Sequence, residues 1–164
     1  MATARVVVVA GDTVELDALG PGLDLLLQWG IDFVGWHGWL ITGEIGLREL
    51  FGLLAQSPQV VIATAKGDAE LARALESCTT APILIVPLHP DNCTDTSTLL
   101  NATELPPTLA AGTLAIGEAG AKNAALLAIQ ILALTDDALR DRLQTYRDQQ
   151  RDTVLAASDP STVN

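Results

Sequence analysis

The stretch GTLAIGEAGAKNAALLAIQILAL, from Gly112 to Leu134, decides the fold class of this chain. It begins with small residues that let backbones approach closely, and from Asn123 it becomes a run of Ala, Leu and Ile with almost no polar interruption. A helix that is apolar on nearly every face is typical of a buried position. The run is barely long enough for a bilayer, and Glu118 and Lys122 at its start favour a core helix instead.

Burial of this helix on every side requires either a large domain or neighbouring subunits. A chain of 164 residues is one ordinary domain, long enough for a real core but short for wrapping a central helix completely. We therefore expect a homo-oligomer in which the helix packs against symmetry-related copies. The alternative is a central helix of a monomer, covered by the sheet of its own chain.

The composition limits the partners and the cellular location that we expect for this protein. Lys and Arg total 9 against 20 Asp and Glu, which gives a formal net charge of −11 and makes nucleic acid and anionic membrane surfaces poor partners. The chain begins without a recognisable cleavable signal, and Cys78 and Cys93 are its only cysteines. With these two cysteines, no metal-ligand spacing and no secretion signal, we expect a protein of the reducing cytoplasm. We also expect no metal or cofactor.

Strand-like and helix-like segments alternate along the first half of the chain. Arg5 to Ala10 is an almost continuous β-branched run, typical of a strand covered on both faces of a parallel sheet. Further strands are predicted at 31–41, 59–64 and 82–86, and helices at 16–29 (interrupted by Gly20-Pro21-Gly22), 43–55 and 67–77. This alternation predicts an α/β fold, a parallel sheet with helices on both faces.

The remaining segments are a long loop and a C-terminal helix. The polar, Thr-rich segment from Pro87 to Thr108 is typical of a functional flap. Thr135 is predicted to cap a helix that runs to about Leu155, with carboxylates in its first turn. A single domain then covers residues 1–156, and residues 157–164 form a loose tail.

Ligands of such a sheet bind at the carboxyl ends of the strands. The candidate site is therefore built from Gly11 to Glu15, the residues after the second strand, Thr64 to Glu70, and the loop from Pro87 to Pro107. The pattern proposes these places without naming a substrate.

Residues 112–132 closely resemble the C-terminal signature of the PurE family, the phosphoribosylaminoimidazole carboxylases and carboxyaminoimidazole ribonucleotide mutases of purine biosynthesis. The likeness continues through Thr135 to Leu155 and covers Gln59 to Ala63 and Pro82 to Pro87. The resemblance implies a three-layer, flavodoxin-like domain, with the C-terminal helix used in oligomerisation, assembled into an octamer.

The family's first motif, Gly-Ser-x-Ser-Asp, holds the substrate phosphate and ribose. Here it reads Gly11-Asp12-Thr13-Val14-Glu15, so the resemblance implies ligand-binding positions at Gly11, Asp12, Thr13 and Glu15. Asp12 brings a negative charge to the place where a phosphate would arrive, and Val14 removes a hydroxyl donor. At a helix N-terminus we interpret Asp12 as a plain cap, and phosphate binding is weakened in either case.

The second motif, Ser-Ala-His-Arg-Thr-Pro, carries the catalytic histidine of the family. An ungapped alignment places Trp39-Leu40-Ile41-Thr42 there, and neither leucine nor isoleucine can transfer a proton. A shifted register instead makes His37 the catalytic residue, without the arginine. The alternative interpretation of His37 is a strand histidine between two tryptophans.

The third motif is glycine-rich so that the backbone closes on the substrate, and here it reads TAKGDAELAR from Thr64 to Arg73. Ala65 and Gly67 are retained as implied ligand-binding positions. Lys66, also at an implied binding position, brings bulk and charge to the pocket, as do Asp68 and Glu70. The alternative is that Asp68 and Glu70 begin a helix, with Lys66 solvated nearby.

The family's Met-Pro-x-Gly segment appears as Leu105-Pro106-Pro107-Thr108, which implies ligand binding at Pro106. His89, in the flap, is a second candidate acid or base, although a lone loop histidine is more often simply solvated. Gly117 to Asn123 could offer N–H groups to an anion, which makes Gly117 and Asn123 the last implied binding positions. The side chain of Glu118 beside them is negatively charged and would repel an anion.

Three hypotheses follow for the function. The favoured one is a catalytically silent paralog that keeps the octameric scaffold and co-assembles with an active copy or binds another partner. The second is retained carboxyaminoimidazole ribonucleotide mutase or carboxylase activity through His37 or His89. The third is an enzyme for a different, non-phosphorylated small molecule that uses Asp12, Lys66, Asp68 and Glu70.

Overall fold

The structure is a computed structural model that describes residues 4–38, 44–66, 70–89, 103, 107 and 110–157. Its contacts divide the chain into two compact units, Met1–Ala128 and Ile129–Asn164. The single domain predicted for residues 1–156 and the tail at 157–164 stay predictions; Ala157 is the last residue of a helix, and the residues after it lie outside the described ranges.

The first unit contains a five-stranded parallel sheet in the order β2-β1-β3-β4-β5. The strands are β1 (Val6–Ala10), β2 (Phe33–His37), β3 (Val60–Lys66), β4 (Ile83–Leu88) and β5 (Ala111–Thr113). β2 is shorter than the predicted strand at 31–41, because pairing with β1 ends where His37 faces Ala10. β5 was not predicted, since three residues that include a glycine carry no readable strand pattern.

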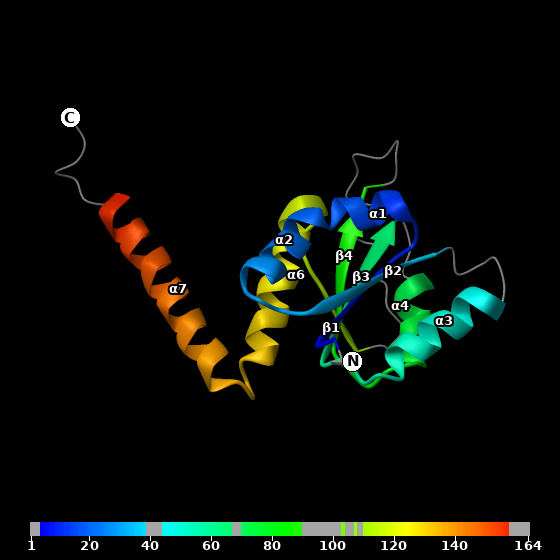
Figure 1. The fold of residues 1–164 in the computed structure, drawn as a ribbon. Helices are drawn as coiled ribbons and strands as arrows, with labels where there is room; N and C mark the ends of the chain where they lie inside the picture. Colours follow the sequence, from blue (N-terminus) through cyan, green and yellow to red (C-terminus); the bar gives the residue numbers. More distant parts are fainter. Residues whose placement is uncertain are drawn as a thin grey trace. The chain divides into compact units, whose positions relative to one another are not determined.

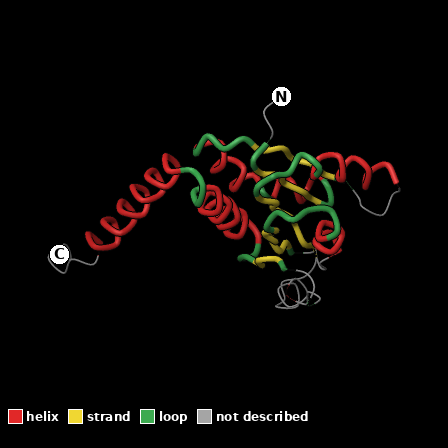
Figure 2. The backbone as a smooth tube through the Cα atoms, turned by 90° about the horizontal axis from the view of Figure 1, so that it is seen from below, coloured by secondary structure: helices red, strands yellow, loops and turns green. Residues whose placement is uncertain are grey.

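Helices cover both faces of this sheet, which confirms the predicted α/β layering (Figure 1). α1 (Thr13–Ala18), α2 (Gly20–Gln28) and the start of α6 (Gly117–Leu132) lie on one face, and α3 (Glu44–Leu54) and α4 (Glu70–Glu76) lie on the other. Figure 2, seen from below, also shows strands lying between helices. The predicted break near Gly20 is present, because α1 ends and α2 begins around Leu19.

The face under α3 and α4 is a continuous apolar core. Alternate side chains of β1, β3 and β4 point to this face, since successive residues of a strand alternate between the two faces. They pack with leucines of both helices in a cluster formed by Val7, Val9, Leu50, Leu54, Val61, Ala63, Ala65, Leu71, Leu75, Ile83 and Ile85. The β-branched runs are therefore covered on this side, as the sequence predicted.

On the opposite face, small residues let α2 approach α6. A Cβ atom built on Gly22 would lie 2.4 Å from the carbonyl oxygen of Ala121, so no larger residue fits there without movement. A Cβ atom built on Gly120 would lie 1.7 Å from the carbonyl oxygen of Ala115 and 3.1 Å from Cγ1 of Val86 in β4. The small residues at the start of this stretch therefore allow close backbone packing, as predicted.

Helix α6 is buried on one side rather than on nearly every side. Ala121, Ala124 and Ala128 are fully buried, whereas Lys122 and Asn123 are exposed. Within the described residues, no helix is long and apolar enough to cross a membrane. The use of a C-terminal helix in oligomerisation stays a prediction.

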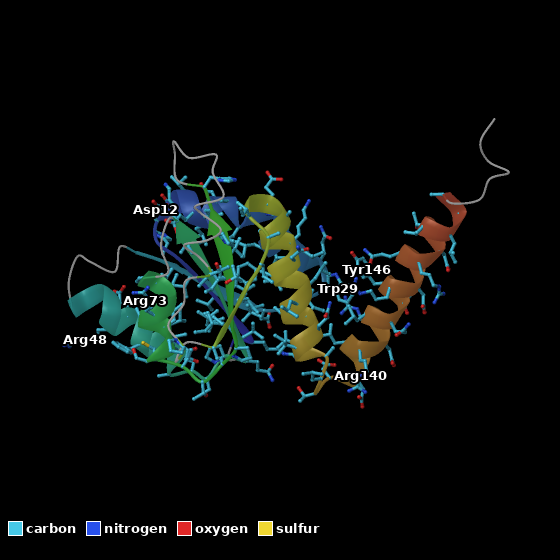
Figure 3. The ribbon with its side chains drawn as sticks, turned by 180° about the vertical axis from the view of Figure 1, so that it is seen from behind. Asp12, Trp29, Arg48, Arg73, Arg140 and Tyr146 are labelled. Atoms are coloured by element: carbon cyan, nitrogen blue, oxygen red, sulfur yellow. The ribbon has the colours of Figure 1, made fainter. Side chains whose placement is uncertain are left out.

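The second unit contains α7 (Asp137–Ala157). The backbone N–H of Leu139 donates to Oδ1 of Asp136 at 3.0 Å, so Asp136 caps the helix and the prediction of Thr135 as the cap was wrong by one position. Ion pairs join Arg140 to Asp137 and Arg151 to Asp148 along its surface, both at 2.8 Å. Figure 3 labels Arg140 and Tyr146 on this helix.

Candidate functional site

A pocket of about 290 Å³ lies at the carboxyl edge of the sheet, beside the ends of β3 and β4. This is the edge at which parallel α/β sheets bind ligands, and the sequence had proposed it. The lining comes from α1, the start of α2, the two strand ends and the N-terminus of α6, and comprises Val14, Glu15, Asp17, Ala18, Pro21, Lys66, Leu88, His89, Gly117 and Glu118.

Glu15 is the buried polar residue of this pocket, with 6% of its surface exposed. Its Oε2 accepts hydrogen bonds from the backbone N–H of Gly11, at 3.0 Å, and from the hydroxyl of Thr64. A Cβ on Gly11 would lie 2.8 Å from Oε1, so glycine is what allows the carboxylate to fold back onto the turn. The N–H of Gly11 in the β1–α1 turn therefore serves a side chain of the protein itself.

Asp12 caps α1. Its Oδ1 accepts from the backbone N–H of Glu15 at 2.8 Å, which is the usual bond between an N-cap side chain and the third residue of the helix. The geometry is that of a plain cap. Ligand binding by Asp12, and by the exposed Thr13 that follows, stays a prediction.

The two histidines of the chain lie at the ends of different strands. His89 follows β4 and lines the pocket, close to Lys66 because the sheet register pairs Lys66 with Leu88. His37 ends β2, the strand at the edge of the sheet beyond β1, and is not among the lining residues. The structure therefore brings His89, rather than His37, together with Glu15 and Lys66.

The other predicted positions divide into three groups. Gly117 lines the pocket in a left-handed backbone conformation, with φ of 66°. Ala65 belongs to the core under α3 and α4, and Asn123 is exposed on α6 outside the pocket lining. Gly67 and Pro106 lie outside the described residues, as do Leu40, Ile41 and Asp68, and the side chain of Glu70 is not described.

Three lining residues lie outside the ranges that the sequence analysis proposed: Asp17, Ala18 and Pro21. Their place at the pocket depends on how α1 and α2 pack beside the strand ends, which no local pattern in the sequence gives. Leu88 falls within the proposed loop from Pro87 to Pro107, and in the structure it is the last residue of β4.

The pocket has an excess of negative charge. Glu15, Asp17 and Glu118 contribute three carboxylates, and Lys66 contributes one ammonium group. Figure 3 shows Arg48 on α3 and Arg73 on α4, away from Asp12, and neither lines the pocket. A phosphate about 4 Å from one of these carboxylates would be repelled by about 1 to 4 kcal/mol, depending on the local dielectric.

Within the part of the chain that the structure describes, no three His, Cys, Asp or Glu side chains are grouped so that they could hold a metal ion.

The strand order 2-1-3-4-5, the parallel pairing and the pocket at the carboxyl edge define a flavodoxin-like α/β domain. The family described as AIR carboxylase matches residues 50–153 of this chain. The chain belongs to this family, which is also called the PurE family.

Full-length relatives support the same assignment. An N5-carboxyaminoimidazole ribonucleotide mutase of Haemophilus influenzae is 34% identical over 164 residues, covering 98% of each protein. A protein of the same name from Vibrio parahaemolyticus is 40% identical, covering 96% of this chain and 98% of the relative. The crystal structure of Treponema denticola PurE shares the fold with a TM-score of 0.79 at 16% identity, covering 97% of this chain and 98% of that one.

Proposed function

We propose that this chain is a catalytically silent, oligomeric member of the AIR carboxylase family whose phosphate-binding turn is occupied by its own Glu15 carboxylate. The single observation that carries the proposal is the pair of hydrogen bonds that Oε2 accepts from Gly11 and Thr64. A ribonucleotide monophosphate needs donors at this turn, and here the N–H of Gly11 and the nearby hydroxyl of Thr64 already have an anionic partner.

The charge of the site supports the same conclusion. A phosphate entering the pocket would have to displace or approach a buried carboxylate that has 6% of its surface exposed. Asp17 and Glu118 add two further negative charges to the lining, against the one positive charge that Lys66 supplies among the described lining residues. Each unpaired carboxylate near the phosphate opposes binding, because the two negative charges repel each other. This repulsion is stronger where water is partly excluded.

The position of the histidines supports the loss of catalysis. Proton transfer requires a side chain within hydrogen-bond reach of the reacting group. His37, the histidine that a shifted alignment restores, ends the edge strand and does not line the pocket. His89 does line it, although its side chain is exposed.

The scaffold role includes assembly into a homo-oligomer, which we propose to be an octamer, either of this chain alone or together with an active member of the family. Apolar side chains left exposed near the C-terminus support association, with Leu134 at 74% and Leu155 at 62% exposure. The charge of −11 argues against nucleic acid and anionic membranes as partners, and we place the assembly in the cytoplasm. Native mass measurement gives the subunit number.

The direct test is a titration of the full chain with aminoimidazole ribonucleotide, followed by its thermal stability, together with an assay of mutase turnover. We expect no stabilisation and no turnover, and a homologous active mutase serves as the positive control. Clear stabilisation combined with turnover would overturn the proposal.

Retained mutase activity is the second candidate, and the presence of His89 in the pocket favours it over a site built on His37. If turnover were found, His89→Asn should abolish it while leaving ligand-induced stabilisation in place. His37→Asn is the matched control and should keep full turnover. The reverse pattern would assign the chemistry to His37.

A further inference from the structure

We propose that the pocket at the carboxyl edge binds a small organic cation, an amidinium or guanidinium group carried on a short apolar body. This goes beyond the scaffold function, because it gives the same pocket a ligand of opposite charge to a ribonucleotide. Its basis is the hydrogen bonding of Glu15, the charge of the lining and the shape of its apolar side.

The strongest indication is a buried acceptor whose hydrogen bonding is incomplete. Both bonds to the Glu15 carboxylate end on Oε2, and among the described residues Oε1 accepts none. The side chain is more than nine-tenths buried and lines the pocket. A buried carboxylate oxygen without a donor is unfavourable, so an N–H group of a ligand would complete its hydrogen bonding.

The charge of the donor follows from the rest of the lining. Asp17 and Glu118 are exposed carboxylates at other points of the pocket, and neither side chain forms an ion pair within the described residues. Lys66 supplies one positive charge against the three carboxylates. A cation is therefore favoured, and a planar group with several N–H donors can serve carboxylates that face it from different directions.

The apolar wall indicates an organic ligand rather than a hydrated metal ion. Val14, Ala18 and Pro21 form one side, and Leu88 closes the end of β4. These side chains offer no hydrogen bonds, so they suit a hydrocarbon or aromatic body. A volume of about 290 Å³ accommodates a six-membered ring with one polar group.

Three isosteric probes separate the charge of the ligand from its shape. Benzamidine is cationic, benzamide is neutral and benzoate is anionic, and all three present a planar group on the same ring. In calorimetric titrations of the full chain at low salt, we expect benzamidine to bind about tenfold or more tightly than benzamide, as for a charge-assisted hydrogen bond. Benzoate should not bind.

Variants then locate the binding. Glu15→Gln removes the charge but keeps an acceptor for Gly11 and Thr64, and it should weaken benzamidine about tenfold. Asp17→Asn, at an exposed position that does not endanger folding, should weaken it about threefold. Asp32→Asn removes the same charge at the amino end of β2 and should leave the affinity unchanged.

The outcomes separate this proposal from the scaffold function. Equal affinity for the three probes, or no benzamidine binding to the folded wild-type chain, would overturn the cation site whether or not the chain proves to be a mutase. An equal loss in Asp17→Asn and Asp32→Asn would also overturn it, since only the total charge would then matter. Mutase turnover in the separate assay would overturn the scaffold function alone.

Discussion

Oε2 of Glu15 lies 3.0 Å from the backbone nitrogen of Gly11 and accepts its hydrogen, so that a carboxylate from the first turn of α1 closes back on the end of β1. The hydroxyl of Thr64, on the neighbouring strand β3, donates to the same oxygen. One side chain thus connects a helix to two strands by hydrogen bonds, at the edge of the sheet where ligands enter. These hydrogen bonds affect both the stability of the protein and the binding of ligands at this edge.

Replacing Glu15 with alanine should destabilise the protein by about 1 to 3 kcal/mol, because the N–H of Gly11 and the hydroxyl of Thr64 lose a common acceptor in a buried place. Glu15→Gln keeps an oxygen acceptor and should lose less. Urea denaturation of the two variants and the wild type measures the difference. An alanine variant as stable as the wild type would mean that water replaces the carboxylate without loss.

The same alanine substitution should create a response to inorganic phosphate. With the carboxylate gone, the donors of the turn are available and a negative charge is removed from the pocket, so added phosphate should raise the melting temperature of Glu15→Ala. The wild type should show no such shift. Sodium chloride at matched ionic strength is the control, and an equal shift in both salts would refute site binding.

Gly22→Ala should destabilise the first unit by about 1 to 3 kcal/mol, since the new Cβ would lie 2.4 Å from the carbonyl oxygen of Ala121 and force α2 away from α6. Gly52→Ala is the matched control. Gly52 lies within α3 with nothing within 4 Å of its Cβ position, so alanine should stabilise the helix by about 0.5 to 1 kcal/mol. In chemical denaturation, the change in the free energy of unfolding should therefore have opposite signs in the two variants. A loss of stability in both would contradict the interpretation that the Cβ position of Gly52 is open.

Asp136→Ala should reduce the stability of α7 by about 1 kcal/mol, because the N–H of Leu139 loses the side chain that caps it. Thr135→Ala changes the neighbouring residue, which lies outside the cap, and should have a smaller effect. Far-ultraviolet circular dichroism during thermal unfolding follows the helix in both variants. If Thr135→Ala were the more damaging change, the assignment of the cap would have to move back by one residue.

The layers of the fold were predictable because their signal is local. Val6–Ala10 is an apolar run typical of a strand covered on both faces, as is the apolar start of Val60–Lys66, and the helical repeats between strands predicted the parallel pairing. β5 was not predicted because three residues carry no periodicity. The end of β2 at His37 was not predicted because pairing with β1, rather than the local sequence pattern, ends the strand.

The site was predictable only as a set of loops. Gly11 to Glu15, the end of β3 and His89 were all proposed, since the carboxyl ends of parallel strands share one edge. Asp17 and Pro21 belong to helix faces whose orientation depends on how α1 and α2 pack. The choice between His37 and His89 could not be made from spacing, because it depends on which strand ends lie beside α1 and the start of α6.

The sequence by itself determined the α/β class and the kinship with the AIR carboxylase family, because both are encoded in apolar periodicity and in contiguous motifs. The tertiary structure alone decided that Glu15 binds Thr64, a residue 49 positions away, and that His89 rather than His37 stands beside it at the pocket. The physical reason is that a hydrogen bond between distant residues depends on which strands lie side by side. That order is set by the packing of the whole sheet, and no local pattern contains it.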